Sequence, residues 1–244
     1  MTLNKAGILA LLFVLISVLC FWEHRQSVPK IALIRIEGTI ENFYAYDRIA
    51  KTALKDDSIR AVVLVIDSPG GTVQACFQAE EAFRKLRERK PVVVSMGQMA
   101  TSGAYLISSV GNYIYAYDFT ETGGLGVIAI WVSYENQLKR EGITYYVWKS
   151  GGAKDIGAEY RGPTEEENRY LQELVDNLMN ELLERILANR PKIQRIEELK
   201  EGYVYYGKDA VDYGLVDEIG DLEDAKQKAA SLAGLKEYQT ITLS

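Results

Sequence analysis

Short apolar runs alternate with segments of helical periodicity, and this alternation constrains the fold more than any other feature of the sequence. The apolar runs, typical of strands, cover residues 31–36, 61–66, 91–96, 113–117 and 144–148. Residues 73–89 and 165–189 instead repeat apolar side chains at helical spacing. Such alternation is typical of stacked β-α-β units, and neither a helix bundle nor a β-sandwich would produce it. We therefore predict an α/β fold with a helical and short-strand region near the C-terminus.

Each predicted helix has its own signal. The first places Cys76, Ala79, Phe83 and Leu86 on one face. The second follows Pro163, and Thr164 with Glu167 predicts a capping box at its start. Its apolar stripe consists of Leu171, Leu174, Leu178, Leu182 and Ile186.

The N-terminal region predicts a membrane anchor. Residues 6–22 carry no charge, and at about 1.5 Å per residue they are just long enough to cross about 30 Å of hydrocarbon. A cleaved signal peptide is the alternative, but residues 19–22 are bulky where cleavage needs small residues. We expect one uncleaved transmembrane helix, with residues 1–28 as anchor and linker and residues 29–244 as one domain. The flanking charges are too balanced to predict its orientation.

Composition excludes several classes of function. The only histidine, His24, lies outside the predicted domain, so a Ser-His-Asp site, a Cys-His site and an imidazole-rich zinc site are excluded. The net charge is -6 and no basic stretch is interleaved with aromatic residues, which argues against nucleic-acid partners. Cys20 and Cys76 do not form a disulfide framework. We expect neither a metal nor a cofactor.

Two glycine-marked turns follow predicted strands. In the first, residues 67–71 (DSPGG), the glycines free backbone N–H groups to hold an oxyanion or a phosphate. A tight connection that binds nothing is equally consistent, and no nucleotide-binding motif accompanies the turn. In the second turn, Ser102 at a helix start is a candidate nucleophile. The alternative is that Thr101 or Ser102 simply caps the helix.

A serine nucleophile needs a base, and Lys154 lies in the glycine-marked sequence GGAKDI. A lysine acts as a base only when its pKa falls to about 7 to 8, which requires burial or a neighbouring cation. Lys149 is the rival base. The alternative reading is an exposed, solvated loop lysine.

Four ordered motifs together resemble signal peptide peptidase A. They are DSPGG at 67–71, SMGQMATSGAYLIS at 95–108, TGGLGVI at 122–128 and KSGGAKDI at 149–156. The resemblance implies a membrane-anchored serine protease with the Clp-protease/crotonase fold. It assigns Ser102 as nucleophile and Lys154 as general base, forming a Ser-Lys dyad. It also assigns the oxyanion turn to Gly71, then Gly70, with the N–H of Gly103 as a second donor.

The resemblance carries further expectations about the protein's setting. Short members of that family form homo-oligomeric rings in which neighbouring protomers can share the dyad. Their substrates are remnant signal peptides and other hydrophobic or unfolded peptides, and their catalytic domain lies on the outer face of the cytoplasmic membrane. One departure is Gly124, where bacterial relatives often have a serine that orients the lysine. Thr122 and Ser150 are the candidate replacements.

Three other functions compete with this interpretation. A crotonase-type enzyme would need neither Ser102 nor an anchor, and a stomatin-associated membrane protease would be expected to lack KSGGAKDI. A non-catalytic, membrane-tethered peptide-binding scaffold is disfavoured because nucleophile, base and oxyanion turn are all present. The tyrosine-rich stretches 145–148 and 203–206 predict strand and core rather than a substrate platform.

Overall fold

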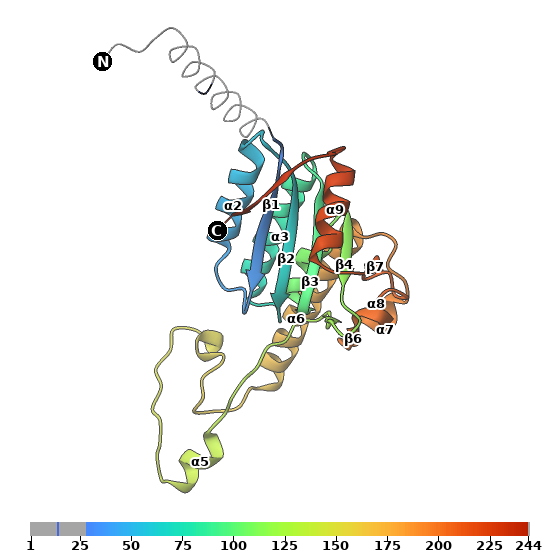
Figure 1. Cartoon of the computed structure of the whole chain (residues 1–244). Helices are drawn as coiled ribbons and strands as arrows, with labels where there is room; N and C mark the ends of the chain where they lie inside the picture. Colours follow the sequence, from blue (N-terminus) through green and yellow to red (C-terminus); the bar gives the residue numbers. More distant parts are fainter. Residues whose placement is uncertain (1–13, 15–27, 244) are drawn as a thin grey trace, which may run out of the picture.

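A mostly parallel sheet forms the centre of the protein (Figure 1). The computed structural model describes Val14 and residues 28–243. In this part of the chain the sheet has eight strands in the order β6-β5-β3-β2-β1-β8, with β4 and β7 extending it beside β3. The strands are β1 Lys30–Glu37, β2 Ile59–Ser68, β3 Val92–Thr101, β4 Tyr113–Ala116, β5 Glu121–Gly123, β6 Val204–Tyr206, β7 Glu218–Ile219 and β8 Gln239–Leu243. Only the β5–β6 pair is antiparallel.

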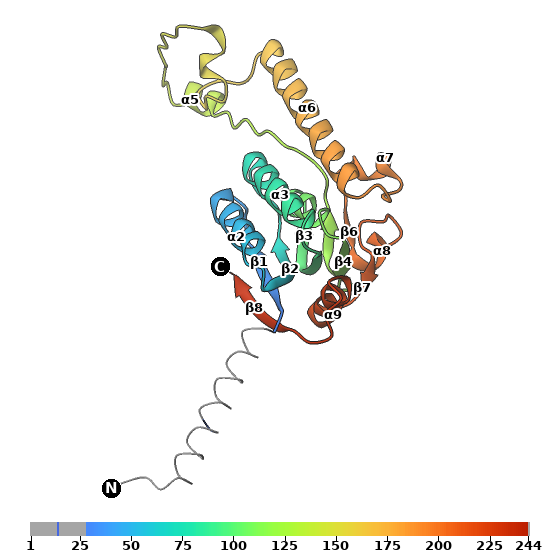
Figure 2. The ribbon, with the colours of Figure 1, turned by 90° about the horizontal axis from the view of Figure 1, so that it is seen from above.

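Helices cover both faces of the sheet (Figure 2). They are α2 Phe43–Lys55, α3 Val73–Arg87, α4 Gly103–Ser108, α5 Glu135–Arg140, the 3₁₀ helix η1 Gly152–Asp155, α6 Glu165–Asn189, α7 Ile196–Leu199, α8 Gly207–Ala210 and α9 Leu222–Leu232. The larger core lies on the side of α2, α3 and α4, and a smaller one lies under α9. The predicted α/β fold is confirmed, as are the first four predicted strands.

Burial on both faces explains why β2 reads as a continuous apolar run. Leu64 and Ile66 point into the larger core, whereas Ala61 and Val63 pack in the smaller one. A strand buried on both sides has no polar face, so its sequence shows no alternation. This is the signal that made residues 61–66 predictable.

The predicted membrane helix, residues 6–22, lies outside the described residues except for Val14. Within the described part, no helix combines the length and apolar character that a bilayer crossing requires.

Helix α6 has the predicted bounds, and Thr164 and Glu167 form the predicted capping box at its start. Its apolar stripe is only partly used. Leu182 and Ile186 are buried, whereas Leu174 is 42% exposed. The C-terminal part of α6 contacts α4 and donates to Glu80 of α3 through Arg185 and Asn189. Figure 2 shows that the N-terminal part of α6 extends beyond the body.

Residues 127–163, which we call the arm, extend away from the sheet between β5 and α6 (Figure 1). The arm corrects the strand predicted at 144–148, because these residues form no strand. They are also not core, since Tyr146 is 77% and Trp148 is 89% exposed. At 203–206 the predicted strand is confirmed as β6, but Tyr203 and Tyr206 are exposed, so the predicted core position is wrong there.

Candidate active site

Ser102 occupies a sharp turn between β3 and α4. Its backbone has φ 54° and ψ −124°, a conformation that only glycine adopts without strain. Its N–H donates to Gly123 O at 2.9 Å, which fixes the turn against the end of β5. Ser102 is the N-cap residue of α4, yet its side chain makes no capping hydrogen bond. The capping role considered from the sequence therefore does not explain its hydroxyl.

The DSPGG turn lies directly against Ser102. A Cβ built on Gly70 would lie 2.8 Å from Gly103 N and 3.1 Å from Ser102 Cβ, so only glycine fits. Gly70 also has φ 100°. Its own N–H donates to Ser68 Oγ at 3.1 Å, which removes it as an oxyanion donor in this conformation.

Two backbone donors beside Ser102 have no partner. Within the described residues, neither the N–H of Gly71 nor that of Gly103 donates a hydrogen bond. Gly103 is the first residue of α4, where the N–H groups of a helix have no intrahelical partner, and Gly71 is exposed, so both N–H groups are open to a ligand. Such a pair can hold the negative charge that develops on a carbonyl oxygen under attack.

A cavity of about 120 Å³ opens beside these groups. Its lining comes from the DSPGG turn, α3, the Ser102 turn, α4, α6 and residues 126–128, and consists of Gly71, Val73, Cys76, Phe77, Ser102, Gly103, Gly126, Val127, Ile128 and Leu182. Six of these residues bring apolar side chains that can contact an apolar peptide side chain, while the glycine backbone and the Ser102 hydroxyl give the rest of the lining a polar character. Burial raises the pKa of the Cys76 thiol to about 11, so this cysteine is protonated at neutral pH and is not a nucleophile.

Sequence reasoning missed Cys76 and Leu182 as cavity residues. Both belonged to predicted apolar helix faces, and a periodic pattern does not distinguish a core position from a cavity wall. The motif TGGLGVI could have indicated part of the cavity wall, because it supplies Gly126, Val127 and Ile128 to the lining.

Gly124 lies close to the nucleophile. A Cβ there would be 3.7 Å from Ser102 N and 3.4 Å from Thr101 Cβ, and its φ is 57°. The two candidate replacements for a serine at this position differ. The buried Thr122 hydroxyl donates to Ala100 O at 2.9 Å, whereas Ser150 is exposed in the arm.

The structure does not bring Lys154 to the cavity of its own chain. Lys154 is an exposed residue of η1 in the arm, and Figure 1 shows the arm projecting away from the sheet. Its ammonium makes no ion pair within the described residues. Lys149 is engaged instead, because its Nζ contacts Asp155 Oδ1 at 2.5 Å and Gly152 O at 2.8 Å.

Comparisons with known proteins identify the family. The profile of peptidase family S49 matches residues 84–236, and the Clp protease profile matches residues 24–117. A protein of Methanocaldococcus jannaschii named as a protease is 35% identical over 188 residues, 77% of this chain and 60% of its own length. A relative from Enterococcus faecium, named signal peptide peptidase SppA, is 32% identical over 240 residues, 90% of this chain and 70% of the relative.

The chain thus spans about three fifths of the length of the M. jannaschii relative. The 1510-N membrane-bound stomatin-specific protease has a similar structure, with a TM-score of 0.57 over 89% of this chain and 98% of that one. The two are 14% identical, so this likeness concerns the fold alone. The sequence matches show that the chain belongs to peptidase family S49, the family of signal peptide peptidase A, and that it is a serine protease.

Proposed function

We propose that the protein is a membrane-anchored endopeptidase in which Ser102 and Lys154 form a Ser-Lys dyad. The observation that carries this proposal is the strained turn at Ser102, whose hydroxyl makes no capping hydrogen bond. Within the described residues, the neighbouring N–H groups of Gly71 and Gly103 donate no hydrogen bond either. Acyl transfer needs a nucleophile that attacks the carbonyl carbon of the scissile bond and donors that stabilise its oxygen, and these groups supply both.

The proposed reaction begins with neutral Lys154, which accepts the Ser102 Oγ proton as Oγ attacks the peptide carbonyl carbon. The N–H groups of Gly71 and Gly103 hold the resulting oxyanion. Lys154 then donates its proton to the leaving amine, and the C–N bond breaks to give an acyl-enzyme. Water hydrolyses the ester and restores the Ser102 hydroxyl.

Lys154 would reach the active site of a second copy of the chain. Its position in the arm supports this arrangement, and so does the exposed apolar surface of the arm. The exposed residues are Ile128, Ile130, Val132, Ile143, Tyr145, Tyr146, Val147 and Trp148. Within the described chain, residues 127–133 and 144–148 also lack backbone–backbone hydrogen bonds. Large exposed apolar surfaces and unpaired extended segments are typical of interfaces. Docking would bury Lys154, as a general base requires.

A membrane is a poorer partner for the arm. The described chain enters the sheet at the amino end of β1, and the arm leaves from the carboxyl end of the parallel strands, at the opposite end of the body (Figure 1). An anchor in residues 6–22 would therefore hold the arm away from the bilayer. We propose remnant signal peptides and other hydrophobic or unfolded peptides as substrates, on the outer face of the cytoplasmic membrane. The apolar side chains that line part of the cavity beside Ser102, Val73, Phe77 and Leu182 among them, support this substrate class.

The test is hydrolysis of a fluorogenic hydrophobic peptide by the full-length protein in detergent, compared among Ser102→Ala, Lys154→Ala and Lys149→Ala. We expect the first two to lose at least about 10⁴-fold in kcat, because each removes one half of a unit that acts together. Lys149→Ala is expected to retain turnover. Circular dichroism and a melting curve check that each variant is folded.

A fluorophosphonate supplies the second measurement. Wild type is expected to be labelled at Ser102, and Lys154→Ala is expected to resist labelling. An active Lys154→Ala with an inactive Lys149→Ala would transfer the base to Lys149. A folded wild type that neither cleaves peptides nor reacts with the reagent would instead support the peptide-binding scaffold.

A further inference from the structure

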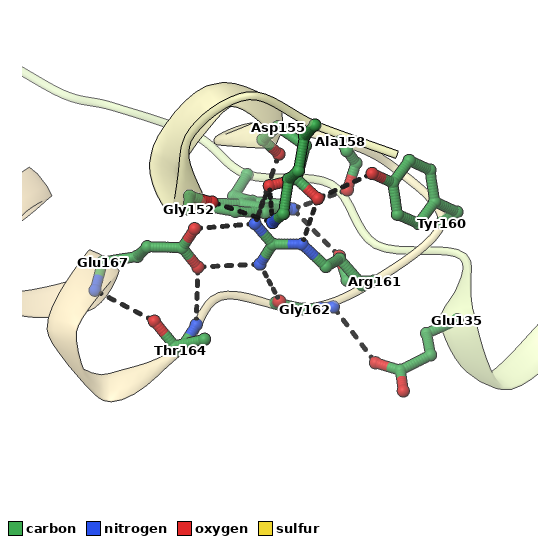
Figure 3. A network of polar contacts seen from close by, with 11 residues as sticks. Glu135, Gly152, Asp155, Ala158, Tyr160, Arg161, Gly162, Thr164 and Glu167 are labelled. Carbon is green, nitrogen blue, oxygen red and sulfur yellow. Dashed lines mark hydrogen bonds and ion pairs between the residues drawn. The ribbon is translucent and has the colours of Figure 1, made fainter. Parts of the chain in front are cut away.

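Arg161 lies at the centre of the polar network that organises the arm (Figure 3). Its guanidinium forms two bidentate ion pairs at once. Nε and Nη2 donate to Asp155 Oδ2 and Oδ1 at 3.0 and 2.8 Å. Nη1 and Nη2 donate to Glu167 Oε2 and Oε1 at 2.7 and 2.6 Å. Nη1 also donates to Gly162 O at 3.0 Å, so the whole donor fork of the arginine is used.

One of these carboxylates belongs to the residue that follows Lys154. Besides Arg161, Asp155 accepts from Lys149 Nζ and from Tyr160 Oη at 2.7 Å. These donors hold the pKa of the Asp155 carboxyl well below its usual range. The backbone of η1 is therefore fixed immediately beside Lys154. The same contacts engage Lys149 with Asp155, whereas Lys154 forms no ion pair with any residue that the structure describes.

The other carboxylate belongs to the start of α6. Glu167 is the third residue of that helix and its capping box joins it to Thr164. The ion pairs and the contact with Thr164 lower the pKa of Glu167 to about 2. Its side chain is 9% exposed and that of Asp155 is 13% exposed, so water screens these pairs less than surface pairs. The loop that carries Lys154 is thus attached to a 25-residue helix whose far end packs in the core.

Arg161 also contacts the outgoing segment of the arm. The guanidinium carbon lies 5.0 Å from the ring centroid of Trp131. The indole Nε1 donates to Ala158 O and to Arg161 O, both at 3.1 Å. One side chain therefore joins the segment that leaves the body, the lysine loop and the helix that returns to the body.

We infer that Arg161 is a positioning residue for Lys154: through Asp155 and Glu167 it fixes the lysine-bearing loop to α6, so that the arm presents Lys154 in a set orientation. The inference rests on the proposed role of Lys154 as the base. Only arginine can form both pairs at once, because a lysine ammonium cannot form two planar bidentate pairs.

The first test is Arg161→Gln in the full-length protein. We expect kcat for the hydrophobic peptide to fall about 10- to 100-fold, because a displaced base loses its alignment with the nucleophile. KM is expected to stay within about twofold, since the cavity beside Ser102 lies in the body and not in the arm. Arg161→Lys should recover part of the loss. Lys139→Gln is the matched control and keeps wild-type kcat, because it breaks only the 2.7 Å pair with Glu135 in the same arm.

The second test separates positioning from folding by mixing inactive chains. In such mixtures one chain, carrying Ser102→Ala, donates Lys154, and the other, carrying Lys154→Ala, donates Ser102. Arg161→Gln is expected to suppress the recovered turnover when placed on the lysine donor and to leave it intact when placed on the serine donor. Equal loss in both arrangements indicates a general structural role and overturns the inference.

The outcomes also distinguish this inference from the proposed function. A wild-type kcat for Arg161→Gln beside an inactive Lys154→Ala overturns the positioning role and leaves the dyad standing. An active Lys154→Ala overturns both.

Discussion

Mixing Ser102→Ala protein with Lys154→Ala protein is expected to restore peptide hydrolysis that neither shows alone. The reason is that Lys154 lies in the exposed arm, whereas Ser102 lies in the cavity of the body. If an arm reaches the neighbouring body, each interface combines one Ser102 with one Lys154 from different chains. In a closed ring of randomly mixed chains, about one interface in four joins two intact residues, so about a quarter of wild-type turnover is expected.

The measurement requires subunit exchange, which co-expression of two differently tagged chains and purification through both tags ensures. The control replaces the lysine donor by a chain that carries both Ser102→Ala and Lys154→Ala, and this mixture is expected to remain inactive. Mixed assemblies that form but do not cleave would show that the dyad is not shared. In that case the arm must fold back so that Lys154 reaches the Ser102 of its own chain.

The arm also shows why part of the structure could not be predicted from the sequence. Residues 144–148 are rich in aromatic and β-branched side chains, which favour strands that pack against a partner. The arm is extended there, but its own chain supplies neither a neighbouring strand nor a covering layer. The local pattern reports only the strand propensity of these side chains, and whether a neighbouring strand is present depends on the rest of the fold.

The candidate site residues divide in the same way, as far as their positions in the fold are concerned. Ser102 and the DSPGG turn were predictable because each lies where a strand ends and a helix begins, and neighbouring parallel strands bring such ends together. Lys154 was assigned by resemblance, and the structure places it in the arm, away from the cavity of its own chain. Arg161 was overlooked, although it lies six residues after Asp155 and six before the capping Glu167. An arginine midway between two acids that flank a helix start is a signal that could have been used.

Gly71→Ala is expected to reduce kcat by about 10²- to 10³-fold, the typical effect of losing one oxyanion donor. A Cβ at this position would lie 1.9 Å from Ile40 O and 2.5 Å from Ile40 C. These are backbone atoms, and Ile40 is held on both sides, since its N–H donates to Gly70 O and its carbonyl accepts from Thr72 N. The turn itself must therefore move, and with it the N–H that would hold the oxyanion. Peptide hydrolysis measures the loss of kcat, and urea denaturation separately measures the loss of stability.

Gly38→Ala is the control for the general cost of replacing a glycine in this region. Its φ is +67° and a Cβ would meet nothing within 4 Å, so we expect about 1 kcal/mol of destabilisation and an unchanged kcat. A comparable loss of kcat in both variants, or no loss in Gly71→Ala, would contradict the role of the Gly71 N–H as an oxyanion donor.

Gly103→Ala provides a second comparison with Gly71→Ala, because the new Cβ at position 103 clashes with a side chain that can itself be replaced. A Cβ there would lie 2.2 Å from Cys76 Sγ and 2.8 Å from Cys76 Cβ, while Gly71 N would remain 3.6 Å away. Gly103→Ala alone is expected to lose activity, and adding Cys76→Gly is expected to restore part of kcat by removing both atoms. The same second substitution cannot rescue Gly71→Ala, whose clash is with backbone. Rescue of Gly103→Ala and not of Gly71→Ala would therefore show that the Cys76 side chain requires glycine at 103, whereas the backbone of Ile40 requires glycine at 71.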